Sequence, residues 1–185
     1  NKADRIEALR DGDRESPFWR YTQAEVHLQW ALARLKFEQY LGAFREVRRA
    51  FKLLEENSRR FPDFAPNAKS LGLLHAIIGA IPDQYKWGVR IVGLDGSIPQ
   101  GMAELRAVLE WSADNDFIFE QETWVYYTLM TLYLENDQQE AWASIETDRL
   151  ELEGHLLNHF VAASVAMRTG RNDRAIELLE SRPTG

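Results

Sequence analysis

Apolar residues recur along almost the whole chain at intervals of three to four positions, and they almost nowhere alternate with polar residues. This spacing predicts amphipathic helices rather than strands. Prolines, glycines and short polar runs separate the periodic stretches. The predicted helices cover residues 17–41, 44–60, 67–80, 82–92, 98–113, 118–135, 138–153, 155–169 and 173–181. The chain is therefore predicted to be all-α.

Helix-breaking residues set the expected boundaries. Ser16 followed by Pro17 is typical of an N-cap and a first helical residue. Gly42 is expected to end the helix that begins there. The segment 81–101 differs from the rest because it is rich in glycine and proline. It is expected to hold a short helix, a turn and the start of another helix.

The carboxy-terminal half repeats itself at a spacing of 34 residues. The paired positions are Tyr126 and Phe160, Tyr133 and Met167, Asn136 and Gly170, Ala141 and Ala175, and Ile145 and Leu179. A period of this length is typical of a two-helix repeat that buries its apolar face only by stacking on a neighbour. The fold is therefore expected to be a stack of helix pairs.

These pairs resemble tetratricopeptide repeats, in which small residues let two helices approach and larger residues fill the gap between them. The last repeat fits the family pattern best, through Ala163, Gly170, Ala175 and Leu179. Turns at Gly42, Gly79, Asn136 and Gly170 would be 37, 57 and 34 residues apart. The longest interval exceeds one period by 23 residues, and that excess falls on 81–101.

The resemblance implies one domain, a right-handed stack of antiparallel helix pairs with an additional helical insertion at about 81–101. The expected repeats span 22–61, 65–113, 118–153 and 155–183. The insertion contains Trp87-Gly88, Gly93-Leu94-Asp95-Gly96 and Gly101-Met102-Ala103-Glu104-Leu105. In these residues it is similar to the glycine-rich insertion of divergent tetratricopeptide proteins related to the inclusion-body clearance family. Ile176 and Leu179 on the last helix should lack a cover, so further chain or a second copy is expected to pack there.

The charge distribution narrows the choice of partner. The net charge is −7, yet residues 1–66 carry 13 Lys and Arg against 11 Asp and Glu. Residues 101–160 carry two Arg against 13 acidic residues, which disfavours nucleic acid as a partner. No apolar stretch is long enough to predict a membrane span. The absence of cysteine excludes disulfides and thiolate sites, and slightly favours a periplasmic over a cytoplasmic setting.

Candidate chemistry is sparse. His155 and His159, with Glu151 one turn earlier, could offer three metal ligands on one helix face. The glutamate that follows the first histidine in metalloprotease helices is replaced by Leu156, and no G-x-S-x-G motif occurs. We therefore predict no catalytic residue, no metal and no cofactor. The alternative is a small-ligand or metal-binding protein, or an enzyme, that uses the 81–101 insertion and the face of the two histidines.

The resemblance also implies that the first helix of each pair lines a concave groove. Carried onto this sequence, the groove positions are Leu32, Lys36, Lys69, Leu73, Tyr126, Met130, Tyr133, Phe160, Ser164 and Met167. The lysine-and-asparagine clamp of chaperone-binding members is not reproduced, since only Lys36 and Lys69 resemble parts of it. An aromatic and methionine-rich groove suits an apolar helix or an extended peptide. The leading hypothesis is a non-enzymatic scaffold that binds a protein or peptide, although the three aromatic residues could equally pack against neighbouring helices.

Overall fold

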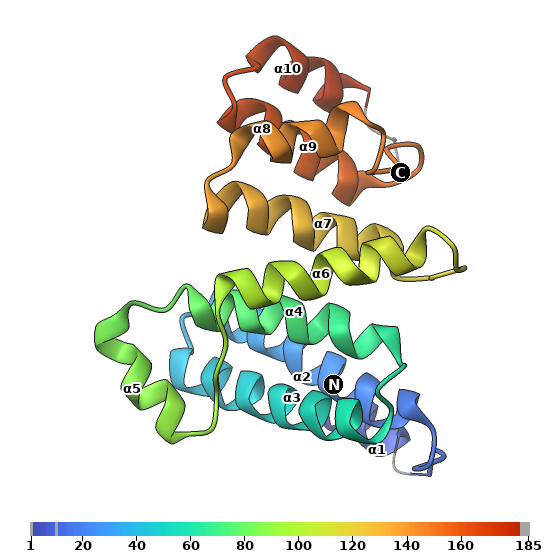
Figure 1. The fold of residues 1–185 in the computed structure, drawn as a ribbon, viewed down its shortest axis with the longest axis vertical. Coiled ribbons are helices and arrows are strands. Elements are labelled where there is room, and N and C mark those ends of the chain that lie inside the picture. The colour runs from blue at the N-terminus through green and yellow to red at the C-terminus, as the bar shows by residue number, and fades with distance from the viewer. Residues whose placement is uncertain (1, 10, 182–185) are drawn as a thin grey trace. The chain divides into compact units, whose positions relative to one another are not determined.

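The computed structural model describes residues 2–9 and 11–181 of the chain (Figure 1). Every regular element in these ranges is a helix, and they contain no strand, which confirms the predicted fold class. The chain divides into two compact units, residues 1–97 and 98–185. The sequence predicts one continuous stack.

The first unit is built around a long hairpin of two helices. Its helices are α1 (Lys2–Ala8), α2 (Pro17–Lys36), α3 (Tyr40–Arg60), α4 (Ala65–Gly79) and α5 (Asp83–Ile91). α2 and α3 pack along each other, α4 packs on α3 and α2, and α1 packs on α2 (Figure 1). Alanines dominate the seam between α2 and α3, because small side chains let the two helix axes approach. The fully buried alanines are Ala24, Ala31, Ala43 and Ala50.

The start of α2 is as predicted, but its end is not. Ser16 is the N-cap, and its side chain accepts a hydrogen bond from the backbone N–H of Phe18 at 3.3 Å. α2 ends at Lys36, where Glu38 takes a left-handed conformation with φ of 58°. The prediction that Gly42 ends this helix is wrong, since Gly42 lies in the first turn of α3. A Cβ at this position would lie 2.9 Å from the Arg34 guanidinium, so the glycine makes room for that side chain.

Two short helices of this unit attach to the hairpin by polar contacts. α1 was not predicted, because only Ile6 and Leu9 in this region are apolar and large. The indole N–H of Trp19 donates to the Leu9 carbonyl at 2.6 Å and so fixes the segment after α1. α5 matches the predicted short helix, and Arg48 Nε donates to the Val92 carbonyl at its end at 2.7 Å.

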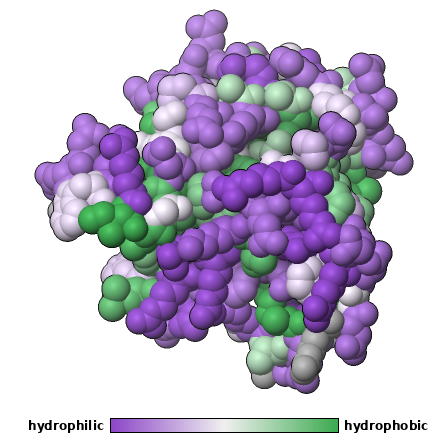
Figure 2. All heavy atoms as spheres, turned by 60° about the horizontal axis from the view of Figure 1, so that its bottom comes forward, coloured by the Kyte–Doolittle hydropathy of each residue, from purple (hydrophilic) through white to green (hydrophobic). Residues whose placement is uncertain are grey.

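The segment that follows α5 presses closely on α4. A Cβ at Gly96 would lie 2.7 Å from the Cα of His75, so only glycine fits at this position. Leu94 is buried beside it, whereas Trp87 and Ile91 on α5 are exposed. Figure 2 shows one face of the molecule, on which apolar side chains interrupt a largely hydrophilic surface.

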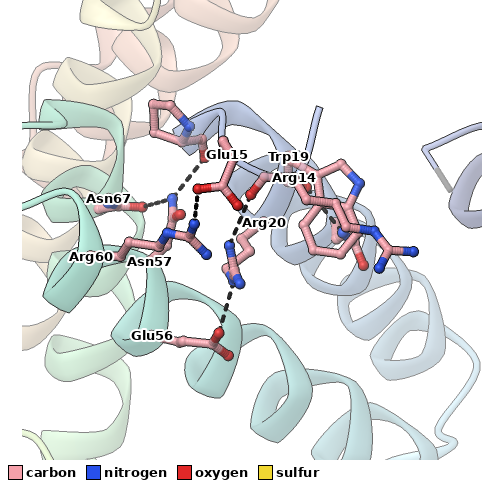
Figure 3. Close-up of polar contacts among 10 residues, drawn as sticks. Arg14, Glu15, Trp19, Arg20, Glu56, Asn57, Arg60 and Asn67 are labelled. Atoms are coloured by element: carbon pink, nitrogen blue, oxygen red, sulfur yellow. Dashed lines mark hydrogen bonds and ion pairs between the residues drawn. The ribbon is translucent and has the colours of Figure 1, made fainter. Parts of the chain in front are cut away.

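Polar side chains hold the start of α2 against α3 and α4 (Figure 3). The contacts join Glu15 to Arg60, Arg20 to Glu56, and Asn57 to both Pro17 and Asn67. Asn57 is fully buried and donates from Nδ2 to the Pro17 carbonyl at 2.8 Å and to Asn67 Oδ1 at 2.9 Å. A buried amide with two acceptors fixes the register of the three helices, because an unpaired buried donor is costly.

The second unit contains the segment whose sequence repeats at a spacing of 34 residues. Its helices are α6 (Ile98–Ser112), α7 (Glu120–Met130), the π-helix η1 (Thr131–Glu135), α8 (Gln138–Glu146), α9 (Leu156–Arg168) and α10 (Asn172–Glu180). α7 contacts α6, α8 and α9, and α10 packs on α9 (Figure 1). Small and branched residues of α9 form the centre of its core, where Val161, Ala162, Val165 and Ala166 are buried.

The turns predicted at Asn136 and Gly170 are present in this unit, whereas one helix ends earlier than predicted. Asn136 and Gly170 end their helices with φ of 57° and 77°. This agrees with their equivalent positions in the 34-residue repetition. α8 stops at Glu146 instead of residue 153, and a non-helical loop follows. Gln121 Oε1 holds this loop, because it accepts hydrogen bonds from Glu151 N and Asn158 Nδ2, both at 2.9 Å.

The predicted repeats map unevenly onto the helices. α2 with α3, α7 and η1 with α8, and α9 with α10 are adjacent helix pairs. The repeat expected at 65–113 is divided, since α4 belongs to the first unit and α6 to the second. α6 packs against α7. The right-handed stacking of tetratricopeptide repeats stays a prediction.

Candidate functional site

The predicted groove positions of the second unit all lie on neighbouring helices. We use the term groove surface for Tyr126, Met130, Tyr133, Phe160, Ser164 and Met167, which lie on α7, η1 and α9. The exposed fraction of the side chain is 48% for Tyr133, 63% for Phe160 and 52% for Met167. Large apolar side chains left this open on adjacent helices are typical of a surface that contacts another molecule.

One tyrosine of the set belongs mainly to the interior. Tyr126 is partly buried and packs against the cores around α9 and around α6. Its hydroxyl donates to Glu122 Oε1 at 2.5 Å. Tyr126 therefore packs against neighbouring helices, the alternative to a role in binding. Tyr133 and Phe160 are exposed and remain available for contact.

A cation–π contact joins the two helices that carry the exposed residues. The Arg168 guanidinium on α9 lies 4.9 Å from the ring centroid of Tyr133 on η1. Guanidinium and ring attract each other through the ring quadrupole, which restrains the tyrosine without covering it. The groove surface thus presents an exposed aromatic ring in contact with a guanidinium of the neighbouring helix.

An apolar depression continues from the groove surface at the start of α9. Its volume is about 470 Å³, and Leu156, Leu157, His159, Phe160 and Leu179 line it. Leu179 and Ile176 on α10 are exposed, as predicted for an uncovered last helix. Phe160 belongs to both the depression and the groove surface, so the two form one apolar area.

The groove positions predicted in the first unit behave differently. The prediction that Lys69 lines the groove is wrong, because its side chain is 0% exposed and cannot contact a partner. Its Nζ lies 3.9 Å from Glu25 Oε2 and 5.7 Å from the ring centroid of Tyr21. Lys36 and Leu32 are exposed and Leu73 is half-buried. The two lysines that resemble a carboxylate clamp therefore do not share a surface.

The histidine pair is not arranged as a metal site. His155 precedes α9 and is exposed, whereas His159 lies inside the helix and is buried. Glu151 lies in the loop, and its Oε2 is 3.7 Å from His155 Nε2. The part of the chain that the structure describes contains no group of three or more metal-ligating side chains. His155 and His159 also lie in a different unit from the segment 81–97.

The first unit contains a cavity that the sequence does not predict. We call it the N-terminal pocket; its volume is about 850 Å³, and it opens between α1, α2 and α3. Its lining residues are Lys2, Ala3, Ile6, Glu7, Leu9, Trp19, Gln23, His27, Trp30, Arg34 and Arg49. This volume is in the range of small-molecule sites, which combine apolar walls with a few polar groups.

Glu46 on α3 organises the polar side of the pocket. It is only 4% exposed, and its Oε2 accepts a hydrogen bond from Lys2 Nζ at 2.5 Å. His27 Nδ1 lies 2.6 Å from the same oxygen, and Arg34 Nε lies 3.4 Å from Oε1. One carboxylate thereby ties α1 and α2 to α3.

The cluster shifts the titration of two of its members. Burial would raise the pKa of Glu46, but hydrogen bonds from Lys2 and His27 outweigh it and hold this pKa below its usual range. Burial lowers the pKa of His27, although Glu46 acts in the opposite direction. Glu46 is thus ionised and His27 neutral near pH 7. A carboxylate only accepts hydrogen bonds, so the ring proton of His27 sits on Nδ1.

The sequence carries no signal for this cluster. Its members lie 19 and 44 residues apart and on three different helices, so no short motif contains them. The positions of His27 and Glu46 on the facing sides of two helices follow only once the α2–α3 register is known.

No protein-family model, no curated protein and no solved structure matches this chain. The resemblance to tetratricopeptide repeats therefore depends on the residues of this chain alone. Among the described residues, no helix is both long and apolar enough to cross a bilayer.

Proposed function

We propose that this chain is a non-enzymatic scaffold that binds a protein or peptide through the groove surface. The observation that carries the proposal is the open apolar face formed by Tyr133, Phe160 and Met167. A monomeric surface seldom exposes several large apolar side chains on adjacent helices without a partner.

The chemistry of this face suits an amphipathic helix or an extended peptide with apolar anchors. Methionine and aromatic side chains adapt to varied apolar partners, as in other helix-binding grooves. The depression beside Phe160 offers a cavity of about 470 Å³ for one anchoring side chain. Anchors that fill such a cavity supply most of the binding free energy of an interface.

The charge of the unit favours a basic partner. Residues 98–185 carry 16 Asp and Glu against six Lys and Arg, a net charge of −10. Opposite charge accelerates encounter and orients the partner, while the apolar contacts supply most of the affinity. The partner we propose is therefore a protein segment with apolar anchors and a net positive charge.

A selection from a random peptide library against the immobilised chain tests this proposal. Enriched peptides should be apolar and basic, and Phe160→Ala should weaken their binding about tenfold or more, as expected for a central anchor. Met167→Ala should weaken binding by a smaller factor.

Ile118→Ala is the control, because Ile118 is an even more exposed apolar residue of the same unit but lies outside the groove surface. Its binding should equal that of the wild type. Failure to enrich peptides, or equal loss of binding in the control, would refute the proposal.

A further inference from the structure

The N-terminal pocket combines an apolar wall with an arginine that has no hydrogen bond or ion pair among the described residues. Trp19 and Trp30 of α2 and Ile6 and Leu9 near α1 supply the apolar surface. Arg49 of α3 also lines the pocket, is exposed, and makes no hydrogen bond or ion pair with any residue that the structure describes.

The other cations of the pocket already have a partner. Lys2 and Arg34 both contact Glu46, so their charges are largely offset by that carboxylate. The charged groups that line or support the pocket, among the described residues, are the cations Lys2, Arg34 and Arg49 and the carboxylates Glu7 and Glu46. With His27 neutral, these five groups leave one positive charge, which a ligand with a single negative charge would balance.

Arg49 favours one kind of anionic group. Its planar guanidinium presents two parallel N–H donors, which match the two oxygens of a carboxylate. Attraction is stronger beside an apolar wall than in open water, because less solvent screens the charges. We propose that the N-terminal pocket binds a small amphipathic monocarboxylate, with its apolar body against Trp19 and Trp30 and its carboxylate on Arg49.

The two tryptophans allow binding to be located. The chain contains six tryptophans, and of these only Trp19 and Trp30 line the pocket. Decanoate, used below its micelle concentration, is the probe, and the ¹H–¹⁵N indole signals of the full chain are the readout. Decanoate should shift the signals of Trp19 and Trp30 and leave those of Trp87, Trp111, Trp124 and Trp142 in place.

Two further probes separate the charge from the apolar body. Decan-1-ol has the same chain without the charge and should bind about tenfold more weakly, the ratio expected from losing one charge-assisted contact. Decyltrimethylammonium carries the opposite charge and should bind still more weakly. Equal affinity for decanoate and decan-1-ol would overturn the proposal.

Arg49→Gln tests the assigned partner of the carboxylate. It should weaken decanoate binding about tenfold and leave decan-1-ol binding unchanged. Arg45→Gln is the matched control, since Arg45 is an exposed arginine one turn earlier on α3 that does not line the pocket.

Both arginines are exposed, so both variants should keep the melting temperature of the wild type. Wild-type decanoate affinity in Arg49→Gln, or signal shifts confined to tryptophans outside the pocket, would show that the inference is wrong.

Discussion

His27 Nδ1 and Glu46 Oε2 lie 2.6 Å apart, so a histidine of α2 and a carboxylate of α3 meet in the interior of the first unit. The carboxylate also accepts a hydrogen bond from Lys2 of α1. A single buried group thus connects three helices. Its protonation state, and that of the histidine beside it, should control how firmly they hold together.

The chain is expected to lose stability as the pH falls below about 6.5. The pKa of His27 in the folded chain is lowered from its ordinary value of 6.5, so the unfolded chain binds more protons in this range. The pKa of Glu46 is also lowered, from 4.5, and it adds a second loss of stability below that pH. Urea unfolding at pH 7.5, 5.5 and 4.0 measures both steps.

His27→Gln should remove the first step and keep the second. Its free energy of unfolding should therefore change less between pH 7.5 and 5.5 than that of the wild type. An unchanged difference between these two pH values would mean that another group causes the loss.

Glu46→Gln should destabilise the chain by about 2 kcal/mol, because a buried charged acceptor is lost while its cationic partners remain. Lys2 and Arg34 are partly exposed and recover some hydration, which limits the cost. Hydrogen exchange should show faster exchange of the α1 amides, since the tie to Lys2 is weakened.

Glu55→Gln is the control on the same helix. Among the described residues, Glu55 pairs with the exposed Arg59, one turn away, and such surface pairs contribute less than about 1 kcal/mol. Equal effects of the two substitutions would contradict a special role for Glu46.

Asn57→Ala should cost about 2 kcal/mol, because it leaves the buried Asn67 Oδ1 and the half-buried Pro17 carbonyl without their donor (Figure 3). Chemical denaturation measures the change in free energy. Lys52→Ala, on the exposed side of the same helix, should change stability by no more than about 0.5 kcal/mol. A loss in Asn57→Ala no larger than in this control would show that the amide contributes little.

Much of the helical framework could be predicted from local sequence. Features set by neighbouring residues were predicted correctly. They are the N-cap at Ser16, the turns at Asn136 and Gly170, and the short helix before residue 93. Gly42 misled the prediction because its small size serves contact with Arg34 and does not end a helix. Such a role is visible only in the packed structure.

The candidate sites were less accessible to sequence reasoning. The exposure of Phe160 and Met167 agrees with the groove positions that the repeat resemblance supplied, but their binding role stays a prediction. The repeat resemblance predicts Lys69 in the groove, whereas the structure buries it beside Glu25 and Tyr21, two contacts that the repeat pattern does not contain. The N-terminal pocket needs α1, which the weak apolar pattern of residues 2–9 did not reveal.

Asn136→Ala should destabilise the second unit by about 1 kcal/mol, because a Cβ-bearing residue without a locally bonding side chain is strained at φ of 57°. Asn136→Gly should stay within about 0.5 kcal/mol of the wild type, since glycine adopts this conformation freely. Thermal unfolding of the two variants measures the difference. A glycine variant as unstable as the alanine variant would show that side-chain contacts of Asn136 outweigh its backbone conformation.

The π-helix η1 changes the directions in which side chains leave this helix, compared with the equivalent positions of α9. Hydrogen bonds from i to i+5 close a wider turn than those of an α-helix, so each residue of η1 advances through a smaller angle. Tyr133 lies in this turn, whereas its echo Met167 lies in the regular α-helix α9. Tyr133 and Met167 therefore leave their helices in different directions relative to the preceding turn, although they are equivalent in the 34-residue repetition. The two halves of the 34-residue repetition are thus not copies of one surface.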